Sequence, residues 1–274
     1  MIWRILLNVV LFSLLTIATQ TGGIVLVICL PIFYFARNKF GKKWKKVGFK
    51  LSSYLILYLA CTTTIIPIIA KQFGRIQLPL FESNHIRPAN ALTYFLNRNY
   101  VRPELKATVE SVAEEMNSKF PGTTINYLDA NFPFINKSPL LPHLSHNDGK
   151  KLDISFFYQA KTGERSNEVP SWIGYGVCEE PKPNEYNMPA ICAAQGHWQY
   201  NALSKIVSQK KKTELLFDAE RTKSMVNFFA AQNSIGRMFI EPHLKTRLGL
   251  KDSKIAFHGC HAVRHDDHLH VQLK

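Results

Sequence analysis

Acidic residues are missing from the N-terminal part of this sequence, where residues 1–75 contain neither Asp nor Glu. The same segment holds ten of the 34 Lys and Arg residues, so the rest of the chain carries 24 basic and 20 acidic residues. The net charge of +14 therefore belongs mainly to the N-terminal segment. A nucleic-acid-binding domain usually carries its positive charge on one face of a folded surface. This distribution argues against such a domain, and we expect no nucleic-acid partner.

Charge of either sign is absent from residues 5–36, which is long for one span because about 20 apolar residues cross a bilayer. The polar run 19–23 divides the stretch, so it is either one long tilted helix or a hairpin of two shorter helices. A second apolar stretch, residues 51–70, has the length of one span. A cleaved signal peptide would account for the first stretch only. We therefore expect residues 1–75 to form a transmembrane anchor of two or three spans.

The loop between the apolar stretches, residues 37–50, is dense in Lys and Arg with interleaved aromatic residues. Cationic loops stay on the cytoplasmic side of a membrane. The span that follows then leaves on the far side, so we expect everything after about residue 72 to be exported.

Cysteine is scarce, and no Cys-x-x-Cys pair occurs, which disfavours a closed structural zinc site. Cys29 and Cys61 lie within the apolar stretches. An oxidising compartment permits one disulfide among Cys178, Cys192 and Cys260. Pairing of Cys178 with Cys192 would close a proline-rich loop and leave Cys260 free, although a bond to Cys260 stays open.

Beyond the anchor, residues 76–100 are expected to form a connector and residues 101–274 a single domain. Pro103 is a favoured first-turn residue, and Asp218 is a suitable N-cap for a helix over residues 218–232. A further helix is expected at residues 197–208, and strands at residues 125–128, 152–158, 237–240, 255–259 and 268–273. Strands and helices mix without a βαβ repeat. We therefore expect an α+β fold with a small antiparallel β-sheet and flanking helices.

Histidine is absent before residue 85, whereas ten histidines follow. Two groups have regular spacings: His143, His146 and Asp153 in HLSHNDGKKLD, and His265, His268 and His270 in HDDHLH. On a strand, alternate residues share a face, so His268 and His270 are expected side by side. A loop histidine, His146, and a strand carboxylate, Asp153, can converge on the same ion. Imidazole and carboxylate are Zn²⁺ ligands, and three protein ligands with an open fourth position are typical of catalytic zinc.

These two motifs, residues 143–158 and 265–272, resemble those of the lysostaphin, D-Ala-D-Ala metallopeptidase and hedgehog superfamily, most closely the penicillin-insensitive murein endopeptidases. The resemblance covers about residues 100–274. It implies a zinc metallopeptidase domain that hydrolyses amide bonds in peptidoglycan stem peptides. The D-Ala–diaminopimelate cross-link is the first choice of bond, and removal of a terminal D-Ala by a carboxypeptidase is the alternative. It also implies a location at the cell inner membrane with the domain facing the periplasm.

The resemblance also implies a role for each motif residue. His146, Asp153 and His270 would bind Zn²⁺, with His143 as an auxiliary group. His268 would be the general base, and His265 would stabilise the charged intermediate or assist proton transfer. The start of the 218–232 helix has no histidine, which departs from the family and leaves a second metal site without a ligand there.

Several alternatives stay open from the sequence. Asp266 and Asp267 either accept hydrogen bonds from imidazoles or belong to a solvated turn. The aromatic residues of and after the 159–196 loop either form a substrate wall or pack in the ordinary way; they are Trp172, Tyr175, Tyr186 and Trp198. Two other classes of protein compete with the enzyme: a membrane-anchored peptidoglycan-binding protein that lost catalysis, and a metal-binding sensor.

Overall fold

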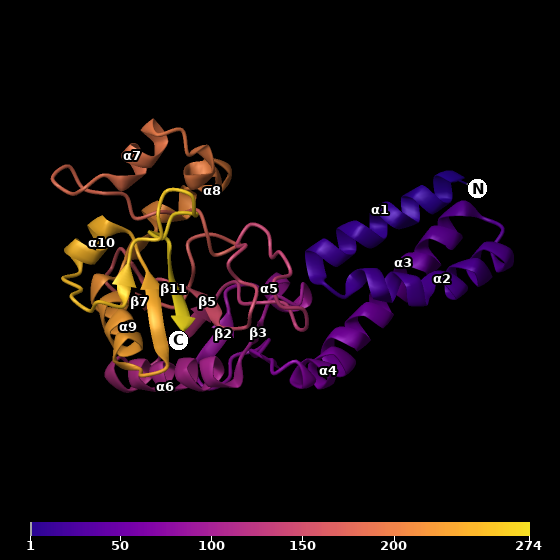
Figure 1. Cartoon of the computed structure of the whole chain (residues 1–274), viewed down its shortest axis with the longest axis horizontal. Coiled ribbons are helices and arrows are strands. Elements are labelled where there is room, and N and C mark those ends of the chain that lie inside the picture. The colour runs from indigo at the N-terminus through magenta and orange to yellow at the C-terminus, as the bar shows by residue number, and fades with distance from the viewer. Residues whose placement is uncertain (1) are drawn as a thin grey trace.

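The computed structural model describes residues 2–274. An elongated bundle of N-terminal helices extends from one side of a mixed α+β domain (Figure 1). The bundle comprises α1 (Ile2–Thr19), α2 (Gly22–Lys39), α3 (Lys43–Ala60), a π-helical turn (Cys61–Ile65) and α4 (Ile66–Gln72).

Residues 5–36 form a hairpin and not one long helix. Helix α1 ends at Thr19, whose hydroxyl accepts a hydrogen bond from the Gly22 amide at 2.7 Å, and Gln20 adopts a left-handed φ of 63°. Glycine at the start of α2 lets the two helices approach closely, because a Cβ atom on Gly23 would lie 2.1 Å from the Thr16 hydroxyl. Small residues have the same use where helices pack in membranes.

Two of the described helices are long and apolar enough to cross a membrane. One is Gly22–Lys39, and the other is the continuous helix Lys43–Gln72, which has 30 residues because the π-helical turn joins α3 to α4 without a break. A shorter apolar helix spans Ile5–Thr19. The apolar side chains of this bundle are largely exposed in the structure, which is what a segment surrounded by lipid requires.

The domain is built on a six-stranded sheet of order β10-β9-β11-β5-β4-β2. Its strands are β2 (Ile86–Pro88), β4 (Ile125–Tyr127), β5 (Lys151–Ser155), β9 (Ile235–Phe239), β10 (Ile255–Ala256) and β11 (His268–Leu273). Two smaller sheets pair β1 (Ile76–Gln77) with β3 (Tyr100–Val101), and β6 (Tyr158–Ala160) with β7 (Arg165–Ser166) and β8 (Leu215–Phe217).

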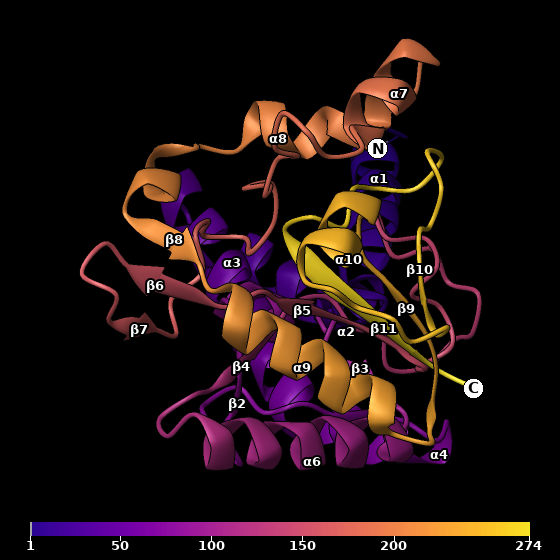
Figure 2. The same ribbon diagram turned by 90° about the vertical axis from the view of Figure 1, so that its left-hand side faces the viewer.

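Two long helices, α6 (Pro103–Lys119) and α9 (Ala219–Ala231), lie side by side over one face of the large sheet (Figure 2). Val109 of α6, Phe229 of α9 and Leu269 of β11 meet there in the main hydrophobic core. Strand alternation then turns His268 and His270 to the opposite face. The shorter helices are α5 (Ala91–Phe95), α7 (Met188–Ala194), α8 (Ala202–Ile206) and α10 (Pro242–Arg247), and 3₁₀ turns occupy Trp198–Asn201 and Lys210–Thr213.

The α+β class is confirmed, but the sheet is mixed and not wholly antiparallel. β10 pairs with β9 and β2 with β4 in parallel, while the pairs that contain β5 or β11 are antiparallel. Each parallel pair is joined by a segment that contains a helix, α10 in the first case and α6 in the second, as a parallel crossover requires. Residues 76–100, expected as a connector, supply β1, β2, α5 and the start of β3, and β2 is an edge strand of the large sheet.

Two local predictions need correction. The strand expected over residues 152–158 ends at Ser155 and resumes as β6 at Tyr158, because the chain leaves the six-stranded sheet here: the Phe157 amide donates to the Thr222 hydroxyl, and β6 belongs to the three-stranded sheet. The disulfide joins Cys192 of α7 to Cys260, and the expected Cys178–Cys192 pair is wrong because Cys178 is free and buried. The bonded residues are 68 positions apart, so spacing along the chain gave no sign of their proximity.

Candidate metal centre

Two neighbouring strands carry two of the three residues of the candidate metal centre. β11 runs antiparallel to β5, and the register places His270 directly opposite Asp153. Side chains on directly opposite residues of an antiparallel pair project from the same face about 5 Å apart. Both side chains are almost completely buried. The sheet itself therefore fixes the imidazole and the carboxylate next to each other.

The third member, His146, comes from the loop between β4 and β5. One ring nitrogen, Nδ1, lies 2.7 Å from the carbonyl oxygen of Ala130. A carbonyl can only accept, so Nδ1 carries a proton and Nε2 is the nitrogen that faces the other two residues. Nε2 lies 3.1 Å from His270 Nδ1 and 3.2 Å from Asp153 Oδ1.

The three donor atoms fit a single metal ion. His270 Nδ1 is 2.9 Å from Asp153 Oδ1, which closes a triangle with sides of 2.9, 3.1 and 3.2 Å. Ligands held at about 2.0–2.2 Å in tetrahedral geometry are separated by roughly 3.3–3.5 Å, so small adjustments suffice. His146, Asp153 and His270 form a buried cluster able to hold a metal ion, which confirms at this level the metal centre expected from the motifs.

Protonation states in the cluster also suit a cation. Burial lowers the pKa of His270 to about 4 despite the nearby carboxylate, so this imidazole is neutral at neutral pH. Burial alone would raise the pKa of Asp153, but the neighbouring imidazoles of His146 and His268 hold it well below its ordinary value. A neutral imidazole and an ionised carboxylate are the forms in which these side chains bind metals.

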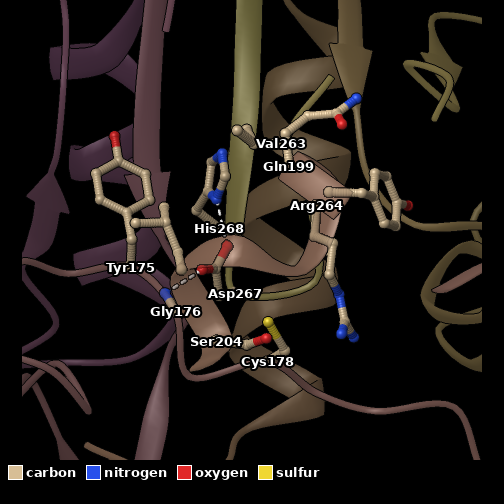
Figure 3. Close-up of a pocket in the computed structure, with 11 residues that line it drawn as sticks. Tyr175, Gly176, Cys178, Gln199, Ser204, Val263, Arg264, Asp267 and His268 are labelled. Atoms are coloured by element: carbon tan, nitrogen blue, oxygen red, sulfur yellow. Dashed lines mark hydrogen bonds and ion pairs between the residues drawn. The ribbon is translucent and has the colours of Figure 1, made fainter. Parts of the chain in front are cut away.

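His268 lies beside the cluster, with its orientation fixed by Asp267. Figure 3 shows Asp267 between the Gly176 backbone and the His268 ring, and its carboxylate accepts hydrogen bonds from the Gly176 amide and His268 Nδ1. The other ring nitrogen, Nε2, is buried without a hydrogen-bond partner and lies 3.8 Å from Asp153 Oδ2. Burial disfavours the charged ring, but Asp267 and Asp153 outweigh it and raise the pKa of His268 to about 9.

His143 is held by a second carboxylate, Asp129. Its Nδ1 lies 2.8 Å from Asp129 Oδ2, and Arg98 binds both Asp129 oxygens at 2.8 and 2.6 Å. Burial would raise the pKa of Asp129, but Arg98 and His143 lower it to about 2. The remaining nitrogen, His143 Nε2, is buried and unpartnered. His143 therefore borders the cluster with one nitrogen available.

His265 completes the set of motif residues brought together. Its ring lies 4.8 Å from that of His268, centroid to centroid, and its Nδ1 has no hydrogen-bond partner. Glu241, buried just after β9, accepts hydrogen bonds from the His265 amide at 3.1 Å and from the Tyr200 hydroxyl at 2.6 Å. The sequence analysis missed Glu241, because no local pattern links it to the histidine motifs.

Tyr175 is the second residue whose role was not predicted from the sequence, where it was considered only as part of a substrate wall or of ordinary packing. Its hydroxyl donates to Asp153 Oδ2 at 2.9 Å and accepts from the Asp129 amide at 3.0 Å. Burial, with Asp153 adding to it, raises the pKa of Tyr175 well above its ordinary value, so the phenol keeps its proton. Tyr175 thus orients the carboxylate of a candidate metal ligand.

The open alternative for the paired aspartates is decided by burial. Asp266 and Asp267 are both buried, which excludes a solvated turn. Asp267 orients His268, whereas Asp266 forms an ion pair with Arg264.

A cleft of 550 Å³ opens onto the cluster. His146, Asp153 and His270 line its floor, and Leu144, Trp198 and His258 are among the residues of its walls. Trp198 is 77% exposed and can touch a ligand, in line with the substrate-wall alternative. Among the other aromatic residues, Trp172 lines neighbouring cavities, and Tyr186 lies in the exposed segment before α7.

No protein-family model matches the chain, and no curated protein matches it. The superfamily resemblance therefore stays a prediction from the two motifs.

Proposed function

We propose that the protein is a membrane-anchored zinc metallopeptidase that hydrolyses amide bonds in peptidoglycan stem peptides. One observation carries the proposal: three metal-donor atoms form a triangle at the floor of an open cleft, with the unpartnered Nε2 of His268 beside them. A site that only stores or senses a metal has no need for an oriented imidazole with an unpartnered nitrogen next to it.

Zinc is the metal that this donor set favours. Two imidazole nitrogens and one carboxylate oxygen, with room for a fourth ligand, make up the set typical of catalytic zinc. Bound there, the ion would polarise the scissile carbonyl and lower the pKa of water to about 7. With the motif resemblance, the donor set supports a zinc-peptidase domain of the lysostaphin, D-Ala-D-Ala metallopeptidase and hedgehog superfamily.

The protein's own groups would move the protons of the reaction. His268 Nε2 accepts a proton from the attacking water and returns it to the leaving amine, while Asp267 stabilises the imidazolium between the two transfers. A cation bound at Asp153 opposes the charge of that carboxylate, which brings the pKa of His268 down from about 9 toward neutral. His265 and His143 border the same space and can donate to the negative charge that develops on the carbonyl oxygen.

The substrate class rests on the motif resemblance and the expected compartment. The cleft of 550 Å³ is large enough for a short peptide with an unusual side chain. Within stem peptides, we propose the D-Ala–diaminopimelate cross-link as the bond cleaved, with the terminal D-Ala–D-Ala bond as the alternative.

Charge and helix length support a three-span anchor in the inner membrane. Helices α1 and α2 have 18 residues each, or about 27 Å at 1.5 Å per residue, close to the thickness of the hydrocarbon core. With the cationic loop 37–50 in the cytoplasm, the α1–α2 turn and the domain both lie on the periplasmic side.

Two single variants test the assignment of base and ligand. His268→Ala should keep its zinc and lose turnover by about 10²–10⁴-fold, mainly in kcat, because a general base acts in the transition state. His270→Ala should lose the zinc itself, since it removes one of three protein ligands. Metal content and cleavage of cross-linked muropeptides are measured on the same preparations. Zinc-free His268→Ala would make His268 a ligand, and unchanged cleavage by it would remove it from the mechanism.

A further inference from the structure

One wall of the metal cleft is tied directly to the membrane helices. The loop over residues 131–149 carries His143 and His146, and Leu144 of this loop lines the cleft. The loop also contacts the periplasmic ends of the anchor, next to a contact made by Asn97, whose side-chain amide donates to the Thr21 and Tyr58 hydroxyls. The proposed site and the bilayer surface are therefore linked through one short segment.

The first contact between this loop and the anchor lies at the α1–α2 turn. The side-chain oxygen of Gln20 accepts hydrogen bonds from the backbone amides of Phe134 and Ile135, at 2.8 and 3.3 Å. Gln20 is only 5% exposed, although it sits at the tip of a hairpin between two apolar helices. The domain covers the tip of this hairpin, which leaves little room for a spacer between the bilayer and the loop.

A second contact comes from the end of α4. The Arg75 guanidinium, fully buried, donates to the carbonyl of Phe132 and to Oδ1 of Asn136. Phe73, at the same end, packs against Phe134 with ring centroids 5.2 Å apart. Phe73 directly follows Gln72, the last residue of the helix, so this pair marks where the loop meets the end of the span.

The outward side of the loop has the composition of a lipid-facing surface. Ile135 is 61% exposed and Leu141 53%. Asp148 is the only acidic residue of the loop and pairs with Lys151, whereas Lys137 is exposed among the apolar side chains. Apolar side chains with a cation favour the interface of a bilayer that contains anionic phospholipid.

We propose that this loop rests on the outer surface of the inner membrane and that the metal cleft acts on stem peptides carried by membrane-attached molecules. The inference rests on the proposed function and narrows its substrate. A peptide tethered to the same bilayer is confined near the cleft, whereas a peptide in the mature peptidoglycan layer is not held at the bilayer surface. Confinement raises the effective concentration of the tethered substrate.

The position of the loop is tested without any measurement of activity. The full chain, with Cys29→Ala and Cys61→Ala, is reconstituted into vesicles of phosphatidylethanolamine and phosphatidylglycerol that contain a spin-labelled lipid quencher. An environment-sensitive fluorophore is attached to Ile135→Cys or Leu141→Cys. The parent chain without either introduced cysteine measures the background labelling of buried Cys178. The matched control is Tyr186→Cys, exposed in the segment before α7 at the end of the domain away from the bundle (Figure 1).

Quenching should be several-fold stronger at residues 135 and 141 than at residue 186. Equal quenching at the three positions would overturn the contact between loop and bilayer.

The substrate is tested with one cross-linked stem peptide in two forms, free and linked to phosphatidylethanolamine in the same vesicles. The native chain should cleave the tethered form roughly tenfold or more faster at equal bulk concentration. Ile135→Glu should lose this preference while it still cleaves the free peptide. Equal rates on both forms would overturn the inference and leave the peptidase intact. Cleavage of neither form would overturn the proposed function, and the quenching result would still decide whether the loop lies on the bilayer.

Discussion

Replacement of Tyr175 by Phe tests whether a side chain that hydrogen-bonds to a candidate metal ligand affects the affinity for the metal. The Tyr175 hydroxyl donates to Asp153 Oδ2 at 2.9 Å and accepts from the Asp129 amide at 3.0 Å. The substitution removes both hydrogen bonds and keeps the ring that packs against His143 and His268. Any change in metal affinity then comes from the hydroxyl alone.

The expected magnitude follows from the two lost bonds. Loss of a group that orients a metal ligand typically weakens metal binding by about 10–100-fold, which corresponds to roughly 1.4–2.7 kcal/mol. The buried Asp129 amide also loses its acceptor, at a cost of about 1–3 kcal/mol in folding stability. Tyr175→Phe should therefore show both a weaker zinc Kd and a lower Tm.

A chelator-competition titration of the full chain in detergent measures the zinc Kd, and thermal unfolding of the metal-free protein measures Tm. The matched control is Tyr127→Phe, which removes a buried hydroxyl that donates to the Pro79 carbonyl at 2.6 Å, outside the metal cluster. The control should lower Tm and leave the zinc Kd unchanged. A zinc Kd for Tyr175→Phe within twofold of the native value would refute the role assigned to this hydroxyl.

Two further predictions concern pH and topology. Burial, with Asp266 nearby, raises the pKa of Glu241 from 4.5 to about 7, so its contribution to stability is fully present below pH 4.5 and is lost as the pH rises through 7. Between pH 4.5 and 7 the free energy of unfolding of the metal-free native chain should thus fall by on the order of 3 kcal/mol relative to that of Glu241→Gln. Parallel curves of Tm against pH for the two proteins would contradict this. A reporter fused after Lys274 that works only in the periplasm should be active; activity of a cytoplasm-only reporter there would reverse the topology.

The strand part of the candidate site could be predicted because strand geometry is local. The alternation that turns His268 and His270 to one face follows from a period of two, and β11 has the bounds expected from the sequence. The pairing of His270 with Asp153 across two strands also needs β5 and β11 to be antiparallel neighbours in one particular register. Motif spacing does not supply this register, and the two residues were expected in one ligand set only because the family resemblance implies it.

The supporting groups could not be predicted, because long-range folding brings them together. Asp129 binds His143, and Arg98 binds Asp129, from segments before the first motif, whereas Tyr175 and Glu241 come from segments between the motifs. Nothing in the residues around these side chains indicates a partner. The parallel strand pairs escaped prediction for a related reason, since short strands such as β2 and β10 acquire their direction from the helices that connect them.

Cleavage of purified cross-linked muropeptides by the full chain tests the central claim most directly. The zinc-loaded protein should split the D-Ala–diaminopimelate cross-link, lose this activity when a chelator removes the metal, and regain it when zinc is restored. His146, Asp153 and His270 are the cluster that holds the ion in this account. No cleavage of cross-linked or uncross-linked muropeptides by the zinc-loaded chain, or cleavage that persists after complete removal of the metal, would contradict it.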